Sequence, residues 1–130
     1  MDRLEVHSTH ACFDGMVRYY SHASSQTKTE MKFSIFFPGQ KRSSHVPGLI
    51  YLAGLTGTDE TFIIKAGALK YASEHELVLI CPDTSRRHAG IRGEDTDWDS
   101  GTGGRFLPRC GKSALGSELQ DVQLHYKRIN

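Results

Sequence analysis

The sequence predicts an α/β fold. Two short, continuous apolar runs, residues 48–53 and 77–81, have the composition of strands that are buried on both faces of a sheet. A glycine-rich loop and a stretch with helical spacing separate these two runs along the chain. Strand, loop, helix and strand in this order are typical of a βαβ unit, in which the two strands run parallel.

The part of the chain before this unit predicts a β-hairpin or meander. Residues 16–21 and 32–37 are rich in aromatic and β-branched side chains and alternate as half-exposed strands do, and Pro38 ends the second of them. Residues 23–30 form a polar connection between the two strands, and residues 40–47 form a polar loop.

The helical part of the unit begins after a capping signal. Thr58 and Asp59 are candidate N-caps, and the apolar residues 62–64 follow them in a short predicted helix. Residues 66–76 predict a second helical piece, and the apolar run 77–81 then ends at Pro82.

Length and charge exclude several functional classes. A chain of 130 residues is one domain in size, and 16 Lys and Arg against 15 Asp and Glu give no basic surface for nucleic acid. No apolar run approaches the roughly 18 residues of a membrane-spanning helix, and residues 1–10 lack the apolar core of a signal peptide. The three cysteines contain no C-x-x-C pair, so we expect a reduced, cytoplasmic compartment and no disulfide framework.

Two motifs that suggest ligands fail on their spacing. Residues 111–113, Gly-Lys-Ser, resemble the end of a P-loop, but Phe106 stands where that pattern needs glycine, which makes a phosphate-binding module a distant alternative. Residues 95–99 alternate aspartates like a calcium loop, but Ser100 and Phe106 stand where glycine and glutamate are required. We therefore expect neither a metal ion nor a cofactor.

The most informative segment is residues 52–58, Leu-Ala-Gly-Leu-Thr-Gly-Thr, directly after the first predicted buried strand. A turn flanked by glycines at this place exposes backbone N–H groups above the carboxyl edge of the sheet. Hydrolases use such an N–H group to bind the oxyanion of the reaction. Taken alone, the segment fits an ordinary structural loop equally well.

Neighbouring segments make the pattern specific. Several short sequence segments occur in a fixed order and spacing: CFDG at 12–15, MKF at 31–33, YLAGLTGT at 51–58, FIIKAG at 62–67, ASEH at 72–75, PDTS at 82–85 and GEDTDWDSGTG at 93–103. Over residues 5 to 103 the chain resembles the S-formylglutathione hydrolase (esterase D) family. The resemblance implies an incomplete α/β-hydrolase fold, with the N-terminal hairpin strands and the first βαβ unit of the sheet.

The resemblance implies thioester hydrolysis, in which a serine on a G-x-S-x-G turn attacks the formyl carbonyl of S-formylglutathione. Glutathione and formate are the products, in a reaction that removes formaldehyde. By resemblance, the backbone N–H of Leu55 binds the oxyanion, and Thr56, Lys65, Asp95 and Trp98 lie near the substrate. The implied partner is a small glutathione thioester, without a cofactor, and the full-length family suggests a homodimer.

The sequence departs from this family in several ways. Members are roughly twice as long, a usual size for one such domain. No G-x-S-x-G occurs in the 130 residues, so we expect the catalytic serine, aspartate and histidine to be absent and the chain alone to be inactive. Gly57 and Arg86 stand where many members have Cys and Pro. The rival interpretation is a non-catalytic fragment that binds a partner through its unfinished sheet.

Residues 104–130 do not continue the family's sequence. Back-translated with free choice of synonymous codons and read in a shifted frame, they can spell P-W, N-Y-R-M-Y and K-E-L at the family's spacing. We therefore expect residues 1–103 to be the N-terminal part of an α/β-hydrolase domain and residues 104–130 to be an out-of-frame, poorly packed tail. A divergent surface tail is the alternative.

Overall fold

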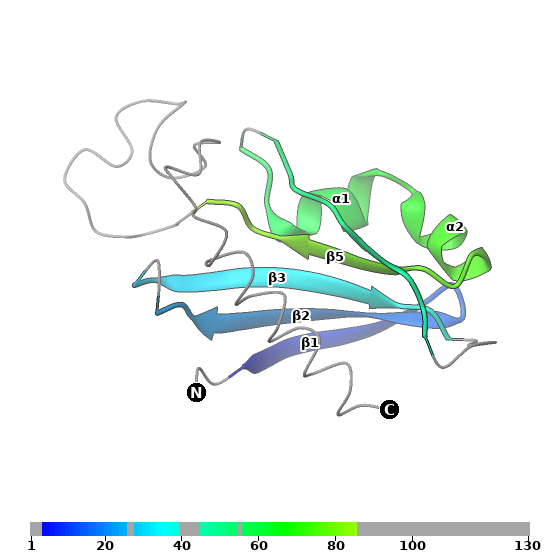
Figure 1. Cartoon of the computed structure of the whole chain (residues 1–130), viewed down its shortest axis with the longest axis horizontal. Coiled ribbons are helices and arrows are strands. Elements are labelled where there is room, and N and C mark those ends of the chain that lie inside the picture. Colours follow the sequence, from blue (N-terminus) through cyan, green and yellow to red (C-terminus); the bar gives the residue numbers. More distant parts are fainter. Residues whose placement is uncertain (1–3, 26–27, 40–44, 55, 86–130) are drawn as a thin grey trace.

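The computed structural model describes residues 4–25, 28–39, 45–54 and 56–85, which form a five-stranded sheet and two helices (Figure 1). The elements in chain order are β1 (Glu5–Cys12), β2 (Gly15–Ala23), β3 (Glu30–Phe37), β4 (Gly48–Ile50), α1 (Asp59–Lys65), α2 (Ala68–Glu74) and β5 (Val78–Pro82). The predicted α/β class is confirmed. The predicted tail, residues 104–130, lies outside the described residues.

The sheet has the strand order β1-β2-β3-β5-β4. The first three strands and the pair β3–β5 are antiparallel, whereas β4 and β5 are parallel. Helices α1 and α2 connect β4 to β5, as the predicted βαβ unit requires, and Figure 1 shows both helices on the same side of the sheet beside β5. Among the described residues, no helix is long and apolar enough to cross a membrane.

The predicted hairpin is confirmed as β2 and β3, whose register runs from Met16 opposite Phe37 to Ala23 opposite Glu30. The strand β1 was not predicted. It joins β2 through a tight turn in which Phe13 and Asp14 both have positive φ, 46° and 58°, as a two-residue type I′ turn requires.

Side chains of alternate residues build a core on each face of the sheet. The helix-covered face contains mainly aliphatic side chains: Val17, Phe36, Ile63, Leu69, Ala72, Leu79 and Cys81. The opposite face is more aromatic: Tyr20, Phe33, Ile35, Phe37 and Val78. Full burial of each large apolar side chain contributes about 1.5–3 kcal/mol, so β3, which supplies both faces, is the central stabilising strand.

The expectation that residues 48–53 form a strand buried on both faces is wrong. Strand β4 ends at Ile50 and lies at the edge of the sheet, with β5 as its neighbour in the described part of the chain. Leu49 and Leu52 are 46% and 45% exposed. The segment is therefore rich in apolar side chains that its one neighbouring strand in the described part of the chain leaves partly exposed. The second apolar run is buried as predicted, in β5.

The helices begin where the capping signals place them. Thr58 is the N-cap of α1, and Asp59 is the first helical residue instead of a cap. The second helix is shorter than the predicted 66–76, because Gly67 takes a left-handed conformation with φ 64° and separates it from α1.

Candidate functional site

The predicted oxyanion segment follows β4 at the carboxyl edge of the parallel pair. Because β4 and β5 run parallel, the segments after both strands meet at the same edge of the sheet. The Thr84 hydroxyl, two residues after β5, donates a long hydrogen bond of 3.5 Å to the carbonyl of Ala53. The two segments are therefore neighbours, as a site built above this edge requires.

Residues 54–57 form a tight turn. The N–H of Gly57 donates to the carbonyl of Gly54 at 2.9 Å, and Thr56, the third residue of the turn, has φ 61°. A positive φ at this position defines type II and type I′ turns, and it is rare for a β-branched residue. Backbone strain of this kind is concentrated at functional sites. Leu55 lies outside the described residues, so its oxyanion role stays a prediction.

Gly57 is required by the shape of this turn. A Cβ atom at this position would lie 2.6 Å from the Cβ of Ala53 and 3.0 Å from the carbonyl oxygen of Gly54. The first distance is shorter than any ordinary contact, so a cysteine at position 57 would force the turn to change. Glycine at position 57, where the resemblance leads us to expect cysteine in many family members, therefore fits the local geometry of this loop.

The loop ends in a capping box at the start of α1. The Thr58 hydroxyl accepts a hydrogen bond from the N–H of Glu60 at 3.2 Å, and the Thr61 hydroxyl accepts one from the N–H of Thr58 at 2.8 Å. These two bonds satisfy backbone donors that the first turn of a helix leaves unpaired. They also fix the direction in which the chain leaves the turn.

A buried serine ties the same helix start to the centre of the sheet. Ser34 of β3 is fully buried, and its Oγ donates to the carbonyl oxygen of Asp59 at 2.7 Å. Sequence analysis did not select Ser34. The signal was present, because Ser34 shares the helix-covered face with Phe36 and is the one hydroxyl in the apolar run of β3.

Two buried aspartates, one after the loop and one after β5, interact electrostatically. The side chain of Asp59 is 6% exposed, and burial, reinforced by the negative charges of Asp83 and Glu60, raises its pKa to about 6. Asp83 is also buried, and its carboxylate accepts the N–H of Ser85 at 3.0 Å. The N–H of Asp83 donates to the carbonyl of Lys32, which joins this segment to β3.

Cys81 is not a candidate nucleophile. Burial raises the pKa of its thiol to about 11, although a hydrogen bond with Ser34 lowers it in part. The thiolate is the nucleophilic form of cysteine, so Cys81 stays protonated and unreactive at neutral pH.

The remaining predicted pocket residues are not brought to the turn by the described structure. Lys65 is exposed at the last position of α1, one helix length of roughly 10 Å from the helix start that the loop adjoins. Asp95 and Trp98 lie outside the described residues. A role of Lys65, Asp95 and Trp98 near the substrate therefore stays a prediction. Among the described residues, no cluster of His, Cys, Asp or Glu is suited to hold a metal ion.

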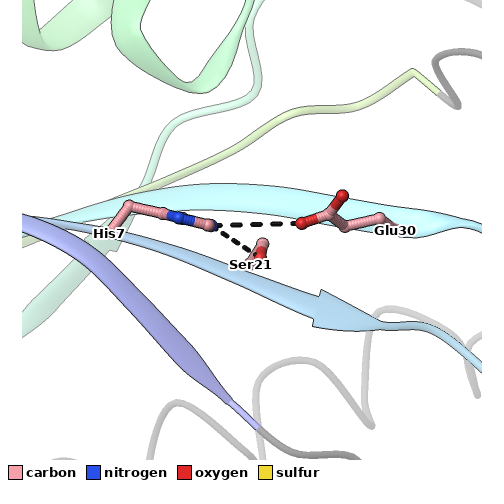
Figure 2. Close-up of polar contacts among 3 residues, drawn as sticks. All are labelled: His7, Ser21 and Glu30. Carbon is pink, nitrogen blue, oxygen red and sulfur yellow. Dashed lines mark hydrogen bonds and ion pairs between the residues drawn. The ribbon is translucent and has the colours of Figure 1, made fainter.

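A serine, a histidine and a glutamate also meet on the neighbouring strands β1, β2 and β3 (Figure 2). The Nε2 atom of His7 lies 2.7 Å from Ser21 Oγ and 4.0 Å from Glu30 Oε1. In a catalytic triad the serine uses one ring nitrogen and the carboxylate uses the other, so that the proton can be relayed. Both contacts here use the same nitrogen, and Ser21 is buried, so this group joins β1 to β2 and β3 and is not a catalytic centre.

Comparison with known proteins identifies the relatives of this chain. Residues 24–118 match the family described as "Putative esterase". The chain is 48% identical over 104 residues to S-formylglutathione hydrolase of Rattus norvegicus and 47% identical over 103 residues to that of Arabidopsis thaliana. These alignments cover 80% and 78% of the chain.

A solved structure has the same arrangement of elements. The S-formylglutathione hydrolase of Agrobacterium tumefaciens matches 77% of this chain with a TM-score of 0.71 and 36% sequence identity. The chain spans 36–37% of the length of these relatives. The α/β-hydrolase fold expected from the sequence is therefore confirmed for the N-terminal portion that the chain contains.

Proposed function

The chain belongs to the "Putative esterase" family, and from this we propose that it carries the oxyanion-binding part of a thioesterase that hydrolyses S-formylglutathione. Its relatives are named for this activity. The proposed compartment is the cytoplasm, which suits a chain whose cysteines form no C-x-x-C pair.

One observation carries the proposal: the strained turn of residues 54–57 lies directly after β4, at the carboxyl edge of the parallel pair. In acyl transfer, negative charge develops on the carbonyl oxygen of the substrate when a nucleophile attacks. A backbone N–H aimed at that oxygen stabilises the transition state by about 2.7–4 kcal/mol. In the proposal, the N–H of Leu55 is this donor, with Thr56 beside the substrate.

The anchors on either side of the turn support this role. The capping box at Thr58 and the bond from Ser34 to Asp59 fix the chain after the turn, and the contact from Thr84 reaches Ala53 before it. A donor that is already in place before the substrate binds needs no reorganisation during the reaction, which is the condition for strong electrostatic stabilisation.

The covalent steps of the proposed reaction use a serine nucleophile, a histidine and an aspartate. In the proposed reaction a serine Oγ bonds to the formyl carbon, its proton passes to a histidine, and the C–S bond then breaks with that proton going to the glutathione sulfur. Water next attacks the formyl-serine and releases formate. The 130 residues contain no G-x-S-x-G, so we expect the chain alone not to catalyse this sequence.

The test is turnover of S-formylglutathione by the purified chain, with the full-length rat relative as a positive control. We expect no turnover above the background reaction, because binding and oxyanion donors alone give only a small part of the acceleration of a triad enzyme. Turnover at an ordinary enzymatic rate that a serine-directed phosphonate abolishes would overturn this expectation.

A second candidate function is favoured by one observation. The outer edge of β4 and its exposed leucines suit a non-catalytic fragment that binds a partner through its unfinished sheet. Neither candidate predicts hydrolysis of a simple aryl ester by the chain alone. The two are separated by adding the C-terminal portion of the rat relative, because only a chain that supplies the oxyanion-binding part should then give hydrolysis.

A further inference from the structure

The start of helix α1 is bonded to the sheet at a place where two acidic side chains are buried. We call residues 58–61, which hold the capping box and the first residues of the helix, the α1 start. Ser34 of β3 donates to the carbonyl oxygen of Asp59, and Asp59 is 6% exposed. Asp83, directly after β5, is 4% exposed. Two carboxyl groups are therefore largely removed from water here.

The strand register places the two acids on the same face of the sheet. Ser34 lies opposite Cys81 in the antiparallel pair β3–β5. The N–H of Asp83 donates to the carbonyl of Lys32 at 2.8 Å, which extends this pairing beyond the end of β5. Because side chains alternate between faces, Asp83 follows Cys81 on the helix-covered face, about 7 Å further along the chain. Ser34 reaches Asp59 on this same face, so the two acids lie beside the same pair of strands.

Titratable groups surround Asp59 on several elements. They come from α1, β2, β3, β5 and the segment after β5: Glu60, Tyr19, Lys32, Cys81 and Asp83. Burial raises the pKa of both Tyr19 and Cys81, so their hydroxyl and thiol groups are neutral near pH 7. On α2, the charged groups of Lys70 and Glu74 are exposed and lie 3.9 Å from each other. The charges that act on Asp59 are therefore those of Glu60, Lys32 and Asp83.

This environment disfavours ionisation of Asp59. Lys32 is exposed, so water and salt screen its positive charge. Burial, which is the largest cause, and the nearby acidic groups of Asp83 and Glu60 raise the pKa of Asp59 to about 6. Above this pH, Asp59 adds a buried negative charge at the point where α1 is bonded to the sheet.

We propose that the contact between the α1 start and the sheet depends on a proton: the contact stays closed while Asp59 is protonated and opens more often once Asp59 and Asp83 are both ionised. Opening lets the Asp59 carboxylate reach water, which removes the cost of keeping the charge buried. It breaks the bond from Ser34 to the carbonyl of Asp59. It also frees the N–H of Thr58, which donates to the Thr61 hydroxyl in the closed form, while the strands of the sheet stay paired.

The direction and size of the effect follow from proton linkage. The closed form binds the Asp59 proton with a pKa of about 6, and a carboxyl group exposed in the open form binds it with the ordinary pKa of 3.8. Between these two values the closed form holds more protons, so a rise in pH favours opening. From pH 4.5 to pH 7.5, the two values increase the open fraction by roughly 25-fold.

The consequence for the candidate site rests on the proposed function. The α1 start directly follows the turn of residues 54–57, so opening removes the anchor on that side of the turn. A backbone donor stabilises an oxyanion strongly only when it is held in place before the reaction. A fall in pH through about 6 should therefore hold the turn more firmly.

The test is amide hydrogen exchange of the 130-residue chain, followed by NMR from pH 4.5 to pH 7.5. The protection of each N–H is expressed relative to its intrinsic exchange rate at the same pH, which removes the chemical pH dependence. We expect the protection of the Thr58 N–H to fall by roughly 25-fold over this range. The N–H of Ser24, which donates to the carbonyl of Thr29 in the β2–β3 connection, should change by less than about twofold.

A matched pair of variants assigns the proton to Asp59. Asp59→Asn removes the titrating group, so the protection of Thr58 should vary by less than about twofold over the same range. Asp14→Asn makes the same substitution at an exposed position of the β1–β2 turn and should leave the fall unchanged. Asp83→Asn removes the neighbouring charge and should make the fall smaller without abolishing it, because burial is the larger cause. Circular dichroism at both ends of the pH range checks that each variant is folded.

Three results would overturn the proposal. They are constant protection of Thr58, an equal fall at Ser24, which would make the opening global, and the same fall in Asp59→Asn as in the native chain. Where Asp59→Asn does not fold, an undiminished fall in Asp83→Asn has the same force. The proposed function fails separately, because this experiment measures exchange at the α1 start and the test of that function measures hydrolysis.

Discussion

Ser34 Oγ donates a 2.7 Å hydrogen bond to the carbonyl oxygen of Asp59, which joins the most central strand of the sheet to the helix that follows the candidate oxyanion turn. The bond spans 25 residues of sequence and is fully buried. Asp59 is the first residue of α1, so its carbonyl oxygen also serves as a helical acceptor, and loss of the Ser34 donor removes a second, buried hydrogen bond from it. The bond therefore couples the stability of the core to the position of the turn.

We therefore expect Ser34→Ala to lower the free energy of unfolding by about 0.5–1.5 kcal/mol, the net contribution of one buried hydrogen bond. The control is Ser73→Ala, because the Ser73 hydroxyl donates to the carbonyl of Phe13 in an exposed setting, where water replaces the lost bond. That variant should lower the free energy of unfolding by less than about 0.5 kcal/mol. Urea titrations of the two variants measure both changes in the free energy of unfolding. Equal changes would show that the buried bond contributes no more to stability than the exposed one.

Asp59 should make the protein less stable as the pH rises. Its pKa is about 6 in the folded chain against 3.8 for an unperturbed side chain, because burial and the nearby charges of Asp83 and Glu60 disfavour the carboxylate. Between these two values the folded state binds more protons than the unfolded state. The contribution of this group is therefore fully present below pH 3.8 and is lost as the pH rises through about 6.

The corresponding variant is Asp59→Asn, which keeps the shape without the charge. At pH 7.5 it should raise the free energy of unfolding by up to about 3 kcal/mol relative to the native chain, and at pH 4 the difference should nearly vanish. A difference between Asp59→Asn and the native chain that is the same at both pH values would contradict the assignment.

Position 57 should not accept a larger side chain. Gly57→Cys restores the residue of many family members but places a Cβ 2.6 Å from that of Ala53, so we expect it to destabilise the fold by about 1–3 kcal/mol. Gly54→Ala is the matched control, because a Cβ there meets nothing within 4 Å. Thermal melts that show equal stability for the two variants would mean that the turn is free to rearrange.

The sequence predicted the elements whose pattern is local. Three of these elements are specified by residues that are consecutive or nearly so in the sequence. They are β3, with its alternation over residues 32–37, the start of α1, with its capping signal at Thr58, and β5, with its apolar run. Strand β1 was missed because most of its residues are exposed on both faces, which removes the alternation that identifies a strand. It is a strand because β2 offers it hydrogen bonds, and that is a non-local condition.

The candidate site was predictable only in part, for the same reason. Glycines directly after an apolar strand located the turn, but the bond from Ser34 to Asp59 and the burial of Asp59 beside Asp83 join residues from separate elements. The prediction that residues 48–53 are buried on both faces was wrong because apolar composition indicates only that a strand is suited to burial. How far it is buried depends on its position in the strand order, and β4 comes last in that order.

The most direct test of the proposed oxyanion role is kcat/KM for S-formylglutathione in a full-length rat relative that carries residues 51–58 of this chain in place of its own. Proline has no backbone N–H, so Leu55→Pro removes the N–H donor, whereas Leu55→Ala retains it. We expect the transplanted enzyme and its Leu55→Ala form to remain active and the Leu55→Pro form to lose about 10²–10³ in kcat. An inactive transplant, or equal activity of the proline and alanine forms, would contradict the account.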